Sequence, residues 1–199
     1  MSVSTPSIHE FRTWNKDLGV ALVVVIALAL GFALSQGVIN RSKTYQEPDS
    51  PFRLEYPARW TNAESLQDVL LKIEDPAANS AFKTTLTVET RELDPSAPPT
   101  MQQLVDRRIE QRGALTAYHF ISERDTTVAG AVAKELQYTY VVQPIDTPRR
   151  AALPVVVIAR DFIVLTPTRS YYFTLAASED DFDSASARMD AILASVKLQ

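Results

Sequence analysis

The chain has 199 residues, a net charge of −4 and 46% hydrophobic residues, which suits one domain of ordinary size with its own core. It contains no cysteine, which excludes disulfides, thiolate metal sites, iron–sulfur clusters, a thiol nucleophile and a lipidated cysteine. The acidic balance disfavours a nucleic-acid binder, because such proteins normally carry a basic face.

Residues 18–39 predict a transmembrane helix after a short N-terminal tail, residues 1–17. The segment LGVALVVVIALALGFALSQGVI carries no charge and is long enough to cross a hydrocarbon core of roughly 30 Å. The alternative is a cleaved signal peptide with a small-x-small site from Ala33 to Ser35. Against it, the apolar run exceeds the usual hydrophobic region of about 7–15 residues in such peptides.

Flanking charges do not decide the orientation of this span. Arg12 and Lys16 precede it, and Arg41 and Lys43 follow it, so the positive-inside counts are equal. We expect a single-pass protein of the cell membrane with its domain on the extracytoplasmic side, because a short uncleaved N-terminal span commonly acts as an export signal.

Residues 40–50 are polar and contain a proline, which predicts a linker, and residues 51–199 predict one α+β domain. Helices are predicted at residues 100–113 and from residue 178 to the end. Alternating and β-prone runs predict the strands. These strands cover residues 52–56, 68–74, 82–90, 120–126, 132–142, 154–165 and 170–177. Consecutive strands with short turns indicate an antiparallel sheet packed between helices.

Local signals mark several boundaries. Thr100 and Gln103 have the spacing of a capping box, and Gly113 can supply a left-handed stop for the same helix. Trp60 follows the first predicted strand, and we expect it to be buried against the sheet.

No catalytic centre is recognisable in the sequence. Gly113 and Gly130 are the only glycines after the apolar segment, which excludes a P-loop and a dinucleotide fingerprint. His119 is the only histidine of the predicted domain, and we expect it at a solvent-facing strand start. The acidic cluster at residues 179–183 fits a helix start, where carboxylates favour the macrodipole, better than a calcium loop. We therefore expect no metal site, no cofactor and no enzymatic activity.

Several segments together resemble the PsbP-like family, which comprises the extrinsic oxygen-evolving-complex protein of photosystem II and its bacterial relatives. They are Phe52 to Trp60 (FRLEYPARW), the turn Val128 to Ala131 (VAGA), Tyr171 to Leu175 (YYFTL), and the closing helix with Phe182 and Ile192 to Val196 (ILASV). The resemblance covers roughly Pro51 to Leu198. It implies an α-β-α sandwich around an antiparallel sheet and a non-enzymatic binding or scaffolding role beside a membrane complex.

Two functions remain in view. The first is a membrane-tethered binding or accessory subunit that docks on a larger membrane protein complex, and the second is a metal-assisted hydrolase with an unrecognised carboxylate site. The absence of cysteine, the single histidine of the predicted domain and the scarcity of glycine in its loops favour the first function. For its partner-binding surface we expect exposed arginines on the helix at 100–113 and in the loop at 144–154. They are Arg107, Arg108, Arg112, Arg149 and Arg150.

Overall fold

The computed structural model describes residues 14–39, 41–48, 50–63, 69–143 and 153–198, in two units, Met1–Arg41 and Ser42–Gln199. In the first unit, helix α1 runs from Trp14 to Ile39 over 26 residues. Within the described residues, no helix has the length and apolar content needed to cross a membrane. The predicted span, residues 18–39, includes position 33 and positions 35–39, whose side chains lie outside the described part.

The described residues of the second unit form two α-helices, one short 3-10 helix and nine strands. In chain order its elements are β1 (Ser42–Gln46), β2 (Arg53–Pro57), β3 (Thr61–Asn62), β4 (Val69–Glu74), β5 (Thr85–Glu92), α2 (Met101–Gly113), β6 (His119–Val128), β7 (Ala131–Val142), β8 (Val155–Leu165), β9 (Arg169–Ser178), the short 3-10 helix η1 (Glu179–Asp181) and α3 (Phe182–Ser195). The predicted succession of strands and helices is confirmed, and β1 and β3 are additions that the sequence analysis did not predict.

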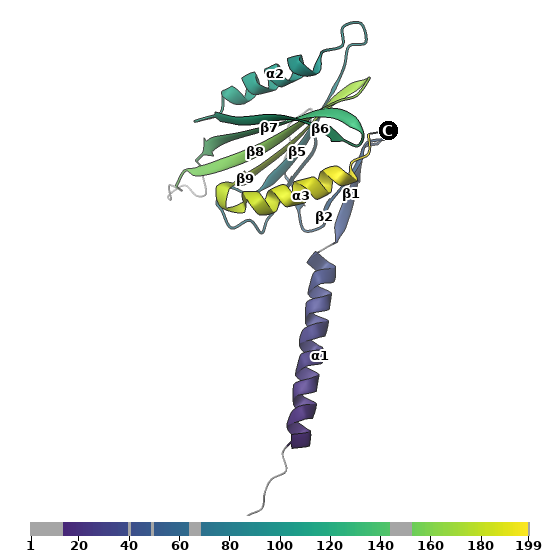
Figure 1. Cartoon of the computed structure of the whole chain (residues 1–199), viewed down its shortest axis with the longest axis vertical. Coiled ribbons are helices and arrows are strands. Elements are labelled where there is room, and N and C mark those ends of the chain that lie inside the picture. Colours follow the sequence, from purple (N-terminus) through teal and green to yellow (C-terminus); the bar gives the residue numbers. More distant parts are fainter. Residues whose placement is uncertain (1–13, 40, 49, 64–68, 144–152, 199) are drawn as a thin grey trace, which may run out of the picture. The chain divides into compact units, whose positions relative to one another are not determined.

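All strand pairs are antiparallel. A seven-stranded sheet has the order β3-β4-β5-β9-β8-β7-β6, and β1 pairs with β2 in a separate two-stranded sheet. Helix α2 covers one face of the large sheet, while α3 and the β1–β2 pair lie over the other face (Figure 1). The domain is therefore an α-β-α sandwich, as predicted.

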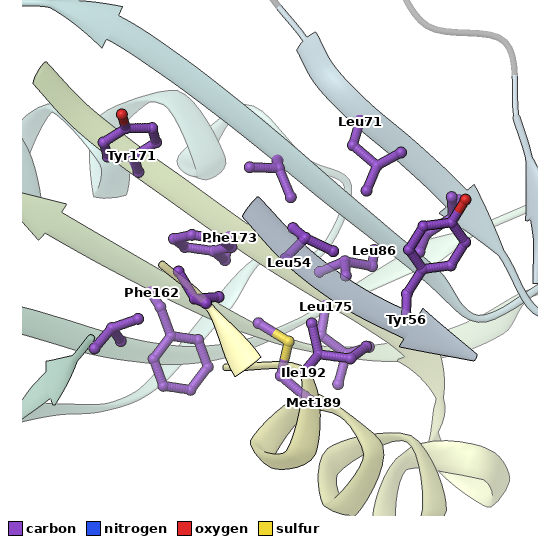
Figure 2. Packing of buried hydrophobic residues seen from close by; sticks show 14 of the residues in the cluster. Leu54, Tyr56, Leu71, Leu86, Phe162, Tyr171, Phe173, Leu175, Met189 and Ile192 are labelled. Atoms are coloured by element: carbon purple, nitrogen blue, oxygen red, sulfur yellow. The ribbon is translucent and has the colours of Figure 1, made fainter. Parts of the chain in front are cut away.

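The main core lies between the large sheet and the layer formed by α3 and β2. Figure 2 shows Leu54 of β2 and Met189 and Ile192 of α3 directed towards Phe173 and Leu175 of β9. Trp60 belongs to this core and is 1% exposed, which confirms its predicted burial. A smaller cluster on the opposite face joins α2 to the sheet. It contains Leu104, Val105, Leu136, Ile163 and Tyr172.

Two local expectations differ from the structure. Residues 42–46, placed in the expected linker, form β1, which pairs with β2, and Tyr45 packs edge-on against Phe52, the residue directly before β2. Gly113 is the last residue of α2 and does not have a left-handed backbone conformation. The C-cap residue, Ala114, has right-handed backbone angles. The capping box of Thr100 and Gln103 is present, with both reciprocal hydrogen bonds.

Candidate functional site

A buried ionic cluster joins α2 to the centre of the sheet. Arg108 is 3% exposed and donates from Nε to Asp161 Oδ2 at 2.7 Å and from Nη2 to Asp161 Oδ1 at 3.0 Å. The same guanidinium group donates to Glu89 at 3.1 and 3.2 Å. Arg108 is therefore an internal structural residue, and the expectation that it is exposed is wrong. Its burial is possible because carboxylates of β5 and β8 compensate its charge.

The neighbouring groups complete this cluster around Asp161, which is fully buried. Arg112 donates from Nε to Asp161 at 3.3 Å, and the Tyr138 hydroxyl donates to the same carboxylate at 3.3 Å. Burial alone would raise the pKa of Asp161, but the charges of Arg108 and Arg112 outweigh it and lower the pKa below its ordinary value. Burial, and then the charge of Asp161, raise the pKa of the Tyr138 hydroxyl.

The five arginines predicted to bind a partner have different surroundings. Arg108 is buried and Arg112 is half-buried, and both contact Asp161. Arg107 is exposed, as expected for a partner contact. Arg149 and Arg150 lie outside the described residues. Partner binding by this set stays a prediction, and in the described part Arg107 is its one fully exposed member.

On the opposite face, ion pairs connect α3 to the sheet and to the loop after β4. Arg160 of β8 donates to Glu135 at 2.7 Å and to Asp190 of α3 at 3.0 Å. Arg188 of α3 donates to the buried carboxylate of Asp75 at 2.9 Å. These groups have partners within the domain, so their role is structural.

Residues with possible catalytic chemistry do not gather into a recognisable centre. His119 begins β6 and is exposed, as predicted. The acidic residues 179–181 form η1 directly before α3, and Asp183 lies in the first turn of α3. In the described part of the chain, no group of three His, Cys, Asp or Glu side chains is arranged to hold a metal ion.

Surface depressions gather around the turn between β8 and β9, beside the N-terminal end of α2. One has a volume of about 450 Å³ and an apolar lining. The described residues of that lining are Leu93, Pro98, Pro99, Met101, Val132, Leu165, Thr166 and Pro167. The side chain of Val132 on β7 is 65% exposed. We call this depression the apolar pocket.

A second depression of about 220 Å³ adjoins the apolar pocket, and both include Leu93 and Pro99. Arg91 of β5 and Arg107 of α2 line it, with Ser170 and Tyr172 of β9. Among the described residues, neither arginine has an ion-pair partner. We call this depression the arginine pocket, and the two pockets together form the candidate site.

The sequence analysis identified only Arg107 of this site. Arg91 was missed because it follows an alternating strand and looks like an ordinary solvent-facing end. Tyr172 is buried in the smaller cluster between α2 and the sheet. The loop with three prolines between β5 and α2 was the available signal, because a rigid loop next to a helix start can form the wall of a pocket.

Comparisons with known proteins identify the fold. No family model matches the sequence, and no curated protein matches it. Among solved structures, cyanobacterial PsbP (CyanoP) from Synechocystis sp. PCC 6803 aligns with a TM-score of 0.57 at 15% identity, over 79% of this chain and 92% of that chain. LpqN, involved in cell envelope biogenesis of Mycobacterium tuberculosis, aligns with a TM-score of 0.54 at 13% identity, over 77% of this chain and 88% of that chain.

A third similar structure is PA94 from Pseudomonas aeruginosa, described as a putative regulator of unknown function, with a TM-score of 0.53 at 14% identity. The alignment covers 80% of this chain and 99% of that chain. The class defined by layers and topology is an antiparallel α-β-α sandwich. Within that class, the domain has the PsbP-like fold, which confirms the expectation drawn from the sequence.

Proposed function

We propose that this protein is a membrane-tethered, non-enzymatic accessory subunit whose domain binds a neighbouring protein of a membrane complex. The observation that carries the proposal is the direct succession of α1 and a PsbP-like domain. In the sequence, residues 18–39 carry no charge, and a helix over these 22 residues would extend about 33 Å at 1.5 Å per residue, which matches a hydrocarbon core of roughly 30 Å.

The tether is short in sequence. Only residues 40 and 41 separate α1 from β1, and an extended residue spans at most about 3.3–3.6 Å. A domain attached in this way stays near the bilayer, so tethering raises its effective concentration for neighbours in the same membrane, and weak contacts suffice. The involvement of LpqN in cell envelope biogenesis supports the proposal that the domain is extracytoplasmic here.

The experiment compares membrane association and complex formation for the full chain and an anchor variant. Val25→Arg with Ala29→Arg places two charges in the apolar helix, where each costs about 2.5–3.5 kcal/mol on insertion scales. The matched control is Val25→Leu with Ala29→Leu. We expect the control to resist carbonate extraction and to migrate with a larger complex in mild detergent, and the charged variant to lose both properties.

Two results would contradict the proposal. Wild-type protein that leaves the membrane in carbonate would refute the tether. Metal-dependent hydrolysis by purified protein, abolished by changing its carboxylates, would favour the hydrolase instead.

A further inference from the structure

The arginines of the domain fall into two groups. In the described part of the chain, all arginines form ion pairs with Asp or Glu except Arg41, Arg91 and Arg107. Two of these three exceptions line the same pocket, although they come from β5 and α2. A domain that pairs its other described arginines leaves two arginines lining one pocket without an ion-pair partner, which indicates a site for an external anionic group.

The floor of the arginine pocket is preorganised. The Arg91 guanidinium carbon lies 5.8 Å from the centroid of the Tyr172 ring, and Arg108 lies 4.9 Å from the same centroid. Tyr172 is 3% exposed, so its ring is a fixed surface on which Arg91 can stack. Because stacking restricts the side chain before binding, less conformational entropy is lost when Arg91 contacts a ligand.

Hydroxyl groups add hydrogen-bonding capacity next to the two arginines. Ser170 lies opposite Arg91 in the β5–β9 register, and its hydroxyl donates to the Tyr172 hydroxyl across a long 3.5 Å contact. Among the described residues, the Tyr172 hydroxyl has no acceptor of its own. A carboxylate could accept from the two guanidinium groups and from this phenol.

Two acidic residues also line the arginine pocket, and both have partners of their own. Glu92 contacts Arg169 at 3.5 Å. Asp94 accepts from the backbone N–H of Ser96 at 2.8 Å and from its hydroxyl at 2.6 Å, and these bonds lower the pKa of Asp94. Neither carboxylate has a described hydrogen bond to Arg91 or Arg107, so the two guanidinium groups remain available.

We infer that the two adjoining pockets bind an extended peptide segment of a neighbouring protein in which an acidic residue and a bulky apolar residue are separated by one residue. The carboxylate occupies the arginine pocket, and the apolar side chain occupies the apolar pocket beyond Leu93 and Pro99. Successive side chains of an extended chain point to opposite sides, so side chains two residues apart lie on the same side, about 6.6 Å from each other, and can enter two adjoining depressions. The inference rests on the proposed docking function and names the chemistry of the docked segment.

The test uses the full chain in detergent micelles, labelled with ¹³C at the methionine methyl groups. Met101 lines the apolar pocket, whereas Met189 is buried in the core on the opposite face of the sheet and serves as an internal control. The probes are three blocked heptapeptides. One contains phenylalanine and glutamate separated by one alanine, the second replaces glutamate with glutamine, and the third replaces phenylalanine with alanine.

We expect the first peptide to shift the Met101 signal with a dissociation constant on the order of 1 mM, as suits a contact assisted by tethering. The Met189 signal should stay in place. The glutamine and alanine peptides should bind at least about 5-fold more weakly, since each lacks one of the two recognised groups.

Variants with matched charge changes identify the pocket. Arg107→Gln and Gln111→Glu each shift the charge of exposed α2 positions by one unit, but only Arg107 lines the pocket. Arg107→Gln should weaken binding of the glutamate peptide about 5- to 10-fold, the net contribution of one ordinary hydrogen bond, because Gln can still donate but carries no charge. Gln111→Glu should retain binding. Val132→Glu should abolish the response, whereas Val156→Glu, at a valine outside both pockets, should not.

Several outcomes would overturn the inference. The first is an unchanged Met101 signal with every peptide, and the second is equal binding of the glutamate and glutamine peptides. The third is a shift of the Met101 signal when anionic lipid is added to the micelles, if the glutamate peptide does not reverse that shift. This result would show that the site binds lipid. If the chain still assembles in its membrane complex in any of these cases, the proposed docking function stands and only this site is wrong.

Discussion

Replacing Asp161 with asparagine removes the carboxylate that compensates the buried Arg108. The two groups are 0% and 3% exposed, and among the described residues the partly exposed Glu89 would be the one remaining carboxylate partner of Arg108. Removing one partner of a buried pair commonly costs about 3–5 kcal/mol, because the remaining charge is desolvated without compensation. With a urea slope of about 2 kcal/mol/M, the unfolding midpoint should fall by about 2 M.

The assay follows urea unfolding of a fragment covering residues 42–199. This fragment contains Trp60 as its only tryptophan, and Trp60 lies in the core, so its fluorescence reports unfolding directly. A double-mutant cycle with Asp161→Asn and Arg108→Gln should give a coupling free energy above 1 kcal/mol, since the groups share hydrogen bonds. The control cycle uses the exposed Arg53–Glu55 pair, 42% exposed on each side, where about 0–1 kcal/mol is expected.

The pH dependence provides a second check of the same cluster. The folded-state pKa of Asp161 lies below its ordinary value of 3.8, so its stabilising contribution is complete above that value. The contribution is lost as the pH falls through the folded-state pKa. The stability difference between wild type and Asp161→Asn should therefore stay constant from about pH 5 to 8 and shrink below about pH 4. A loss under 1 kcal/mol at neutral pH, or a difference that grows in acid, would refute this reasoning.

Three further outcomes are expected. Trp60→Ala should cost about 3–5 kcal/mol, measured by circular dichroism during denaturation, and a much smaller loss would contradict its role in the core. Thr100→Ala should cost about 1 kcal/mol, because it removes the hydrogen bond that the Thr100 hydroxyl accepts from the backbone N–H of Gln103, whereas Ser96→Ala at an exposed position of the preceding loop should cost less. Intact-mass analysis should find the segment before Gln36 retained, and protease added to sealed cells should digest the domain; cleavage near Gln36 or full protection would contradict the anchor or its orientation.

The order of elements was predictable because each strand and helix carries its own periodic signal. The long strand at 154–165 and the capping box at Thr100 are local features, and both appear as expected. Strand β1 was missed because four of its five residues are exposed, so its sequence has no apolar alternation, and only pairing with β2 makes it a strand.

The burial of Arg108 could not be predicted from α2 alone. Its position, four residues after Leu104 and three after Val105, is on the buried stripe, but an arginine there resembles a solvated residue. The compensating carboxylate is 53 positions away on β8. A signal did exist, because Arg160 and Asp161 interrupt a β-prone apolar run, and a charge in the centre of such a strand requires a buried partner.

The same reasoning explains why function should be sought at Arg91 and Arg107 and not along the whole arginine surface of α2. A buried guanidinium group is costly unless carboxylates surround it, so Arg108 is committed to holding α2 on the sheet, and Arg112 shares that carboxylate. A partner that recruited either group would have to break the cluster around Asp161 and lose that stabilisation. Arg91 and Arg107 have no such internal obligation among the described residues, and Tyr172 holds one of them in place. Binding energy from these two groups is therefore available to a partner without any cost in domain stability.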